Sequence, residues 1–107
     1  MSGFVVKRGH VFRVVLGQGP TVLGLVLSND RHNTEYDEYV TAQVAASKEH
    51  EGTGGSVRLK SGDPAFGYVI CRDIGMVHRE ELKEDIGPLS METMLEVERT
   101  LKQVLGL

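Results

Sequence analysis

The fold is decided by the stretch Thr21–Ser28, whose sequence is TVLGLVLS. Apart from its two ends and one glycine, this stretch is wholly apolar. A short apolar run of this kind is typical of a strand that is buried on both faces. Asn29 and Asp30 follow it, and their side chains can hydrogen-bond their own backbone, which predicts a turn. We therefore expect a strand at the centre of a small barrel.

Several other segments predict strands around this central one. Val11–Leu16 is rich in β-branched and aromatic residues, and three turn-forming residues within 17–20 end it. Ser56–Lys60 alternates polar and apolar residues, as a half-exposed strand does. Closely spaced short strands favour a sandwich or a barrel over a parallel sheet. The remaining strands are expected at Tyr39–Ala46 and at Tyr68–Cys71, continuing through Ile74 to Val77, with a charged and glycine-rich loop at Lys48–Gly55.

The C-terminal segment changes to a helical period. Its apolar residues recur three and four positions apart, which predicts one amphipathic helix with a single apolar stripe. Ser90 is suited to cap the start of this helix, and Gly106 is suited to end it. Arg79–Asp85 is expected to form a short helical turn before the helix. The apolar positions of the stripe are Met91, Met94, Leu95, Val97, Leu101, Val104 and Leu105.

Length and composition exclude several classes of protein. A chain of 107 residues fits one domain, 1–107. Its formal net charge of −3 gives no overall basic field, so binding to nucleic acid would need a local patch of Arg and Lys. Cys71 is the only cysteine, and the histidines lack the spacing of metal ligands, so we expect neither a disulfide nor a metal or other cofactor. No apolar run approaches the roughly 20 residues that span a bilayer, and the N-terminus lacks the order of a secretory signal. A cytoplasmic protein is expected.

Three blocks of sequence resemble the PemK/MazF family of toxin endoribonucleases, which belongs to the PemK-like/CcdB superfamily. The first block is Lys7–Gly9 followed by an apolar strand, and the second is Leu25–Asp30, LVLSND. Family members have these features in the same order and with similar spacing. The third block comprises Tyr68–Ile74 (YVICRDI), Glu81 and Leu82, Ile86–Ser90 (IGPLS) and a helix that ends at Val104–Leu107 (VLGL).

The resemblance implies a fold, an activity and partners. The fold would be mainly β (α+β): an SH3-like small β-barrel of about five to seven strands with a C-terminal α-helix. Family members are toxins of type II toxin–antitoxin systems and typically homodimers. They cleave single-stranded RNA without a metal, through attack of the 2′-hydroxyl on the adjacent phosphate, and an antitoxin silences them. This chemistry needs a group that takes the hydroxyl proton and a cation that stabilises charge on the phosphate.

The sequence departs from the family pattern at the catalytic positions. Aligned from Asn29, the position of the family's catalytic Arg is Val22, and the position of its Thr is Ala45. An aliphatic side chain cannot hold phosphate charge. The first interstrand loop is also shorter than in the family by roughly six residues. Further departures are Leu23 for the usual Pro, Gly75 for an Arg, and His10 for the Asp of the opening motif.

Substitutes for the missing pair are sought among polar residues elsewhere. Arg13 and Arg72 lie inside apolar runs, where charged residues are uncommon unless they have a partner or a function. They are therefore the preferred phosphate-binding candidates. His10 is a candidate base or acid near neutral pH. Ser47 would replace the Thr if the preceding loop held two extra residues, because a shift of two keeps the same strand face. Arg31, Arg58 and Gln18 are the candidates for binding RNA.

Two functions from different classes remain open. The first is a metal-independent endoribonuclease with an altered active site, controlled by an antitoxin. The alternative is a catalytically inactive relative, which would act as a binding module or as a CcdB-like toxin that targets gyrase. A plain SH3-like adaptor is a third, weaker interpretation.

Overall fold

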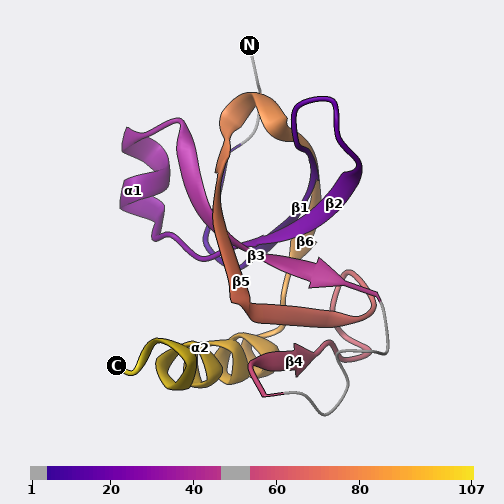
Figure 1. Cartoon of the computed structure of the whole chain (residues 1–107), viewed down its shortest axis with the longest axis vertical. Helices are drawn as coiled ribbons and strands as arrows, with labels where there is room; N and C mark the ends of the chain where they lie inside the picture. The colour runs from indigo at the N-terminus through magenta and orange to yellow at the C-terminus, as the bar shows by residue number, and fades with distance from the viewer. Residues whose placement is uncertain (1–4, 47–53) are drawn as a thin grey trace.

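The structure is a computed structural model, and it describes residues 5–46 and 54–107. Six antiparallel strands form one sheet in the order β4-β5-β3-β2-β1-β6. The sheet curls strongly, and a C-terminal helix packs beside β4 at one end (Figure 1). The elements are β1 His10–Val15, β2 Thr21–Val26, α1 Asp30–Glu35, β3 Glu38–Ala45, β4 Ser56–Arg58, β5 Tyr68–His78, the 3₁₀ turn η2 Arg79–Glu81, β6 Leu82–Pro88 and α2 Met91–Leu105.

The predicted fold class, a mainly β barrel-like domain with a C-terminal helix, is confirmed. The barrel is open, because β4 and β6 stand at the two edges of the sheet and pair with β5 and β1 alone. The long strand β5 allows the sheet to curl. Its pairing with β3 shifts between Ala42 and Gln43, where the partners change from Ile74 to Ile70. Such an irregularity bends a strand and increases its twist.

Two apolar clusters stabilise the curled sheet, one on each face. Leu25 of β2 is fully buried in the first cluster, and its neighbour Val26 is fully buried in the second. Alternate residues of a strand point to opposite faces, so this strand is buried on both, as its apolar sequence predicts. The first cluster lies under α2 and includes Val11, Leu25, Val44, Val57, Val69, Cys71 and Val97; the second includes Val6, Phe12, Val14, Val26, Tyr39, Val77 and Leu82.

Helix α2 begins and ends where its capping residues predict. The Ser90 side chain accepts a hydrogen bond from the Thr93 amide, and Gly106 adopts the left-handed conformation, with φ 73°. The predicted single apolar stripe is wrong in part, because the helix buries Thr93 and Val97 and only half-buries Met94 and Leu101. The burial of the polar residue Thr93 is possible because its hydroxyl donates a hydrogen bond to Asp63 at 2.6 Å, which offsets the cost of removing it from water. The remaining stripe residues, Met91, Leu95, Val104 and Leu105, are exposed.

Two local predictions need correction. Asn29 and Asp30 do not form a simple turn, because Asn29 caps helix α1 and accepts from the His32 amide at 2.8 Å. Asparagine favours turns and helix N-caps for the same reason, so local sequence does not separate the two. The helical turn expected over Arg79–Asp85 covers only Arg79–Glu81, and the chain then enters β6. Pairing with β1 over-rides the local preference there.

The predicted strands otherwise lie within one or two residues of those observed. Most of the predicted loop Lys48–Gly55 lies outside the described residues. In the part of the chain that the structure describes, no helix is both long and apolar enough to cross a membrane.

Candidate functional site

The two positions that the sequence alignment predicts for the family's Arg and Thr, Val22 and Ala45, lie on the neighbouring strands β2 and β3. Leu23 of β2 pairs with Val44 of β3, and Gly24 pairs with Gln43. When this antiparallel register is continued by one residue, Val22 lies opposite Ala45. Side chains directly opposite in an antiparallel pair are neighbours on one face of the sheet. The sheet register therefore brings the aliphatic side chains of Val22 and Ala45, the two predicted positions, to one face of the sheet.

A hollow of about 170 Å³ opens beside Val22, and we call it the strand-face hollow. Its polar side chains are Thr41, Gln43 and Asp73, and none of the described residues that line it is basic. The Thr41 hydroxyl is already directed to the Gly75 carbonyl at 3.5 Å. The hollow offers hydrogen bonds but no positive charge for a phosphate. Its other lining residues are Val14, Leu16, Val22, Leu23, Gly24, Gly75, Met76 and Val77.

A larger hollow, of about 460 Å³, lies between the end of β3 and the segment that joins β4 to β5; we call it the loop pocket. Arg58 and Lys60 bring two positive charges to its lining. Phe66 lines it too, although this ring belongs to neither core cluster and the residue is 92% exposed. The other lining residues are Ala46, Leu59, Ser61, Asp63, Pro64, Ala65, Gly67 and Tyr68.

The loop pocket is rigidly attached to the rest of the fold. Gly67 has φ 113°, and a Cβ atom at this position would overlap the carbonyl oxygen of Ala45. Asp63 accepts hydrogen bonds from the amides of Lys60 and Ser90, both at 2.7 Å, and from the Thr93 hydroxyl at 2.6 Å. Burial alone would raise the pKa of Asp63, but the donors at Thr93, Lys60 and Ser90 outweigh it and lower the pKa below its usual value.

A third hollow, of about 350 Å³, lies between β4 and helix α2, and we call it the β4–α2 groove. Arg58 lines this groove as well as the loop pocket, so the two hollows are adjacent along β4. The groove adds a further cation, Arg99, and an acid, Glu96. Glu96 forms an ion pair with Lys60 of the loop pocket, with Nζ and Oε2 2.7 Å apart. The other lining residues are Ser56, Val57, Thr100 and Gln103.

His10, a predicted catalytic residue, is held by a carboxylate. His10 lies at the start of β1, and its Nδ1 is 3.0 Å and 3.1 Å from the two carboxylate oxygens of Asp85 in the middle of β6. The Gly87 amide donates to the same carboxylate at 2.9 Å. A carboxylate at Nδ1 fixes the orientation of the imidazole and leaves Nε2 as the nitrogen that can exchange a proton with a substrate.

The predicted arginines have separate partners. Arg13 contacts Glu84 of β6 through Nε at 3.1 Å and Nη2 at 3.0 Å. Arg72 donates from Nη1 to the Gly54 carbonyl at 2.7 Å, and Arg31 pairs with Glu35 on α1 at 3.3 Å. Strands β2 and β3 separate Arg13 on β1 from Arg72 on β5, so these two do not form a pair.

The remaining predicted residues are Gln18, Ser47 and Arg58. Gln18 is exposed in the turn between β1 and β2, and Ser47 lies outside the described residues. Among the predicted positions within 5–46 and 54–107, Arg58 alone lines two of the three hollows described above. Within 5–46 and 54–107, no group of three or more His, Cys, Asp or Glu side chains could hold a metal ion.

Comparison with known proteins decides the family. Residues 7–105 match the model of the PemK-like, MazF-like toxins of type II toxin–antitoxin systems. The chain belongs to this family. It is similar to a protein of Mycobacterium tuberculosis named endoribonuclease MazF4, with 29% identity over 100 residues that cover 94% of this chain and 92% of the relative.

Solved structures of MazF-like toxins have the same fold. A mycobacterial endoribonuclease, solved in complex with its cognate antitoxin, is 27% identical with a TM-score of 0.88, and the match covers 95% of this chain and 96% of that one. A MazE–MazF structure from Deinococcus radiodurans has a TM-score of 0.83 at 20% identity, over 97% of this chain and 98% of the other, which supports the fold alone.

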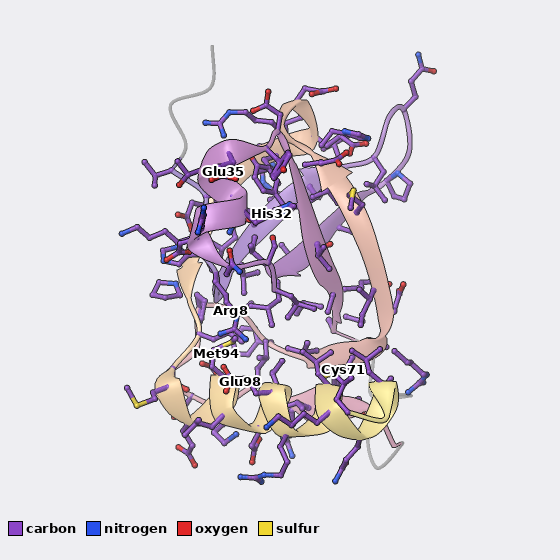
Figure 2. The ribbon with its side chains drawn as sticks, turned by 90° about the vertical axis from the view of Figure 1, so that its left-hand side faces the viewer. Arg8, His32, Glu35, Cys71, Met94 and Glu98 are labelled. Carbon is purple, nitrogen blue, oxygen red and sulfur yellow. The ribbon has the colours of Figure 1, made fainter. Side chains whose placement is uncertain are left out.

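The family's opening block has a structural role in this MazF-like chain. The Arg8 guanidinium donates to the Leu27 carbonyl at 3.0 Å and to Glu98 of α2 at 2.9 Å, while the Arg8 amide donates to Asp30 at 2.7 Å. Figure 2 shows Arg8 beside Met94 and Glu98, where the N-terminal segment approaches α2. This contact joins three parts of the fold that are distant in sequence.

Sequence reasoning missed the residues that surround Arg58. Lys60 was predicted only as the end of a strand, and neither Arg99 nor Phe66 was singled out. The available signal was an aromatic residue between the turn Gly62–Pro64 and the next strand, where no core needs it. Only the tertiary fold shows that Phe66, Lys60 and Arg99 gather around Arg58.

Proposed function

We propose that this chain is the toxin of a type II toxin–antitoxin pair and that it cleaves single-stranded RNA without a metal, using an altered active site. The supporting observation is the match to MazF-like endoribonucleases over more than nine-tenths of both chains. The proposed partners are single-stranded RNA, a cognate antitoxin and a second copy of the chain, in the cytoplasm.

The proposed reaction is attack of a ribose 2′-hydroxyl on the adjacent phosphate. The new O–P bond forms as the bond to the 5′-oxygen of the next nucleotide breaks, which leaves a 2′,3′-cyclic phosphate and a free 5′-hydroxyl. A base must take the 2′-hydroxyl proton, an acid must give a proton to the leaving oxygen, and a cation must stabilise the phosphorane charge. Val22 and Ala45 supply none of these groups.

His10 is the candidate for proton transfer. Asp85 binds Nδ1, so Nε2 is the nitrogen left to exchange the proton. The imidazole side chain is 23% exposed, which leaves it accessible from solvent. Ser47 remains a candidate substitute for the family's Thr.

Arg13 and Arg72 are the candidate phosphate ligands among the predicted catalytic residues. The pair of Arg13 and Glu84 is about half-exposed, with side chains 46% and 55% accessible. Exposed pairs of this kind contribute only about 0–1 kcal/mol, so a phosphate can displace the carboxylate. Arg31, Arg58 and Gln18 stay candidates for contacts along the RNA.

One observation favours the alternative, a catalytically inactive relative that binds RNA or a protein target such as gyrase. The strand-face hollow is lined by Val22, the aligned position of the family's Arg, and no described residue in its lining is basic. A scaffold that retained binding and lost cleavage would have this arrangement.

Cleavage of a fluorophore–quencher RNA in EDTA separates the two functions. Wild-type protein is expected to cleave, and His10→Ala is expected to lower kcat by about 10²-fold or more, because it removes a proton-transfer group. Tyr36→Ala, at an exposed aromatic residue beside α1, serves as the matched control and should cleave like wild type.

Two outcomes would contradict the proposal. RNA that stays intact at micromolar wild-type protein removes the ribonuclease function, and binding without cleavage would then support the inactive relative. Activity that His10→Ala and Tyr36→Ala retain equally would instead remove His10 from the reaction.

A further inference from the structure

We infer that the loop pocket and the β4–α2 groove form one continuous track for single-stranded RNA, in which Phe66 stacks on a base and Glu96 occupies the place of a phosphate at Lys60. The inference rests on the proposed function and gives its substrate a path over this face. The path differs from the strand-face hollow, where the resemblance puts the reacting groups.

The track is continuous because Arg58 lines both of its halves. The loop pocket lies on one side of this residue, with Lys60, and the β4–α2 groove lies on the other side, with Arg99. Helix α2, which contains Arg99, and strand β4, which ends at Arg58, lie side by side at one end of the molecule (Figure 1), and Lys60 follows β4 by two residues. Three cations in a row suit a backbone that carries one negative charge per nucleotide.

The local charge of the track is opposite to that of the whole chain. The chain has a formal net charge of −3, whereas the described residues that line the track include the cations Lys60, Arg58 and Arg99 and the acids Asp63 and Glu96. Asp63 has a structural role, because its carboxylate oxygens accept hydrogen bonds from backbone amides and from the Thr93 hydroxyl. Such a patch is what an acidic protein needs in order to bind a polyanion.

Phe66 gives the track a stacking surface. The residue is 92% exposed, and Gly67, which follows it, packs against the backbone of Ala45 with a positive φ. The chain is therefore fixed immediately after the ring, at the rim of the pocket. An exposed aromatic side chain next to a row of cations is the combination with which proteins bind single-stranded nucleic acid of any sequence.

Glu96 acts as an internal anion in the track. Its carboxylate lies 2.7 Å from Lys60 Nζ, and the two side chains are 41% and 31% exposed. A phosphate oxygen offers Lys60 the same contact that Glu96 makes, and the exposed pair is weak enough to exchange. Glu96 therefore competes with RNA, so its neutralisation should strengthen binding.

The test measures binding apart from cleavage. The probe is a fluorescein-labelled 2′-O-methyl RNA of about eight nucleotides, which cannot undergo 2′-hydroxyl attack, and anisotropy is recorded in EDTA at several salt concentrations. Phe66→Ala is expected to raise Kd about 5- to 100-fold, whereas Phe66→Tyr keeps the ring and should bind like wild type. Glu96→Gln is expected to lower Kd about threefold. Tyr36→Ala is the matched exposed-aromatic control and should leave Kd unchanged.

Each outcome decides the inference separately from the proposed function. Weakened binding by Phe66→Ala and tighter binding by Glu96→Gln support the track, even if wild-type protein does not cleave natural RNA. Equal Kd values for wild type, Phe66→Ala and Tyr36→Ala overturn the track, and the ribonuclease function then stands or falls by the cleavage assay. An unchanged RNA Kd together with a weakened antitoxin complex in Phe66→Ala would assign this surface to the antitoxin and overturn the inference.

Discussion

The strand-face hollow and the loop pocket differ in the charge of the residues that line them. The first is lined by Val22, which the alignment from Asn29 predicts to be the position of the family's Arg, and none of its described lining residues is basic. The second has two cations, Arg58 and Lys60, and an exposed aromatic ring. The backbone of the family is therefore kept, while positive charge is found on a different part of the surface.

The difference shows that a fold and its chemistry are under separate constraints. Strand register and core packing fix which positions face each other, whatever side chains fill them. Charges on a surface change at little cost to stability, because exposed side chains contribute little to folding.

Gly67 is the joint between the loop pocket and β3, so Gly67→Ala should have the largest effect. A methyl group there would overlap the Ala45 carbonyl at a backbone φ of 113°. We expect a loss of at least about 3 kcal/mol in the free energy of unfolding, measured by urea denaturation. Gly62→Ala, where a Cβ meets no atom within 4 Å, should change it by less than about 0.5 kcal/mol. Equal stability of the two variants would contradict this steric account.

Asp63 should make the stability of the loop pocket depend on pH. Its hydrogen bonds hold the folded pKa below the usual value, so the stabilisation is present above the unfolded pKa of about 3.9 and is lost as pH falls through the folded pKa. Asp63→Asn is expected to cost about 1–3 kcal/mol at pH 7 and much less at about pH 2. Urea denaturation at both pH values measures this, and a difference that stayed constant with pH would refute the assignment to the charged form.

The sequence predicts those parts of the fold that are determined by residues close together in the chain, and it predicts less well those determined by contacts between distant segments. The ends of α2 follow from Ser90 and Gly106, because a cap is made by residues within one turn. Helix α1 was missed because Asn29 serves a turn and an N-cap by the same hydrogen bond. Strand β6 was missed because pairing with β1, about 75 residues earlier in the chain, decides it.

For the candidate site, too, the sequence predicts single residues better than it predicts their neighbours in the fold. Arg58 was named from the sequence, but its neighbours come from the loop after β4 and from α2. His10 was also named, whereas its partner Asp85 was expected in a helical turn and lies instead on β6. Contacts between elements depend on the sheet order, which local pattern does not specify.

The family's pair can be restored to test the strand-face hollow itself. Val22→Arg combined with Ala45→Thr would place a cation and a hydroxyl opposite each other on β2 and β3. We expect the double variant to cleave RNA about tenfold faster than wild type, because positive charge then faces the phosphate. Val22→Arg with Ala45→Val is the matched control, which has the same charge without the hydroxyl. A double variant no faster than wild type would show that this hollow no longer receives RNA.

The smallest effect is expected for the ion pair within the proposed RNA track. Lys60 and Glu96 are only 2.7 Å apart, yet both side chains are about one-third exposed, and the Arg13–Glu84 pair between β1 and β6 is still more accessible. Double-mutant cycles in urea should give less than about 1 kcal/mol of coupling for each pair, and less at high salt. A coupling well above this for Lys60 and Glu96 would make the pair a structural element and would contradict its exchange with phosphate. A small coupling means that the protein loses little when RNA takes the place of Glu96, so the carboxylate can lower RNA affinity without being needed for folding.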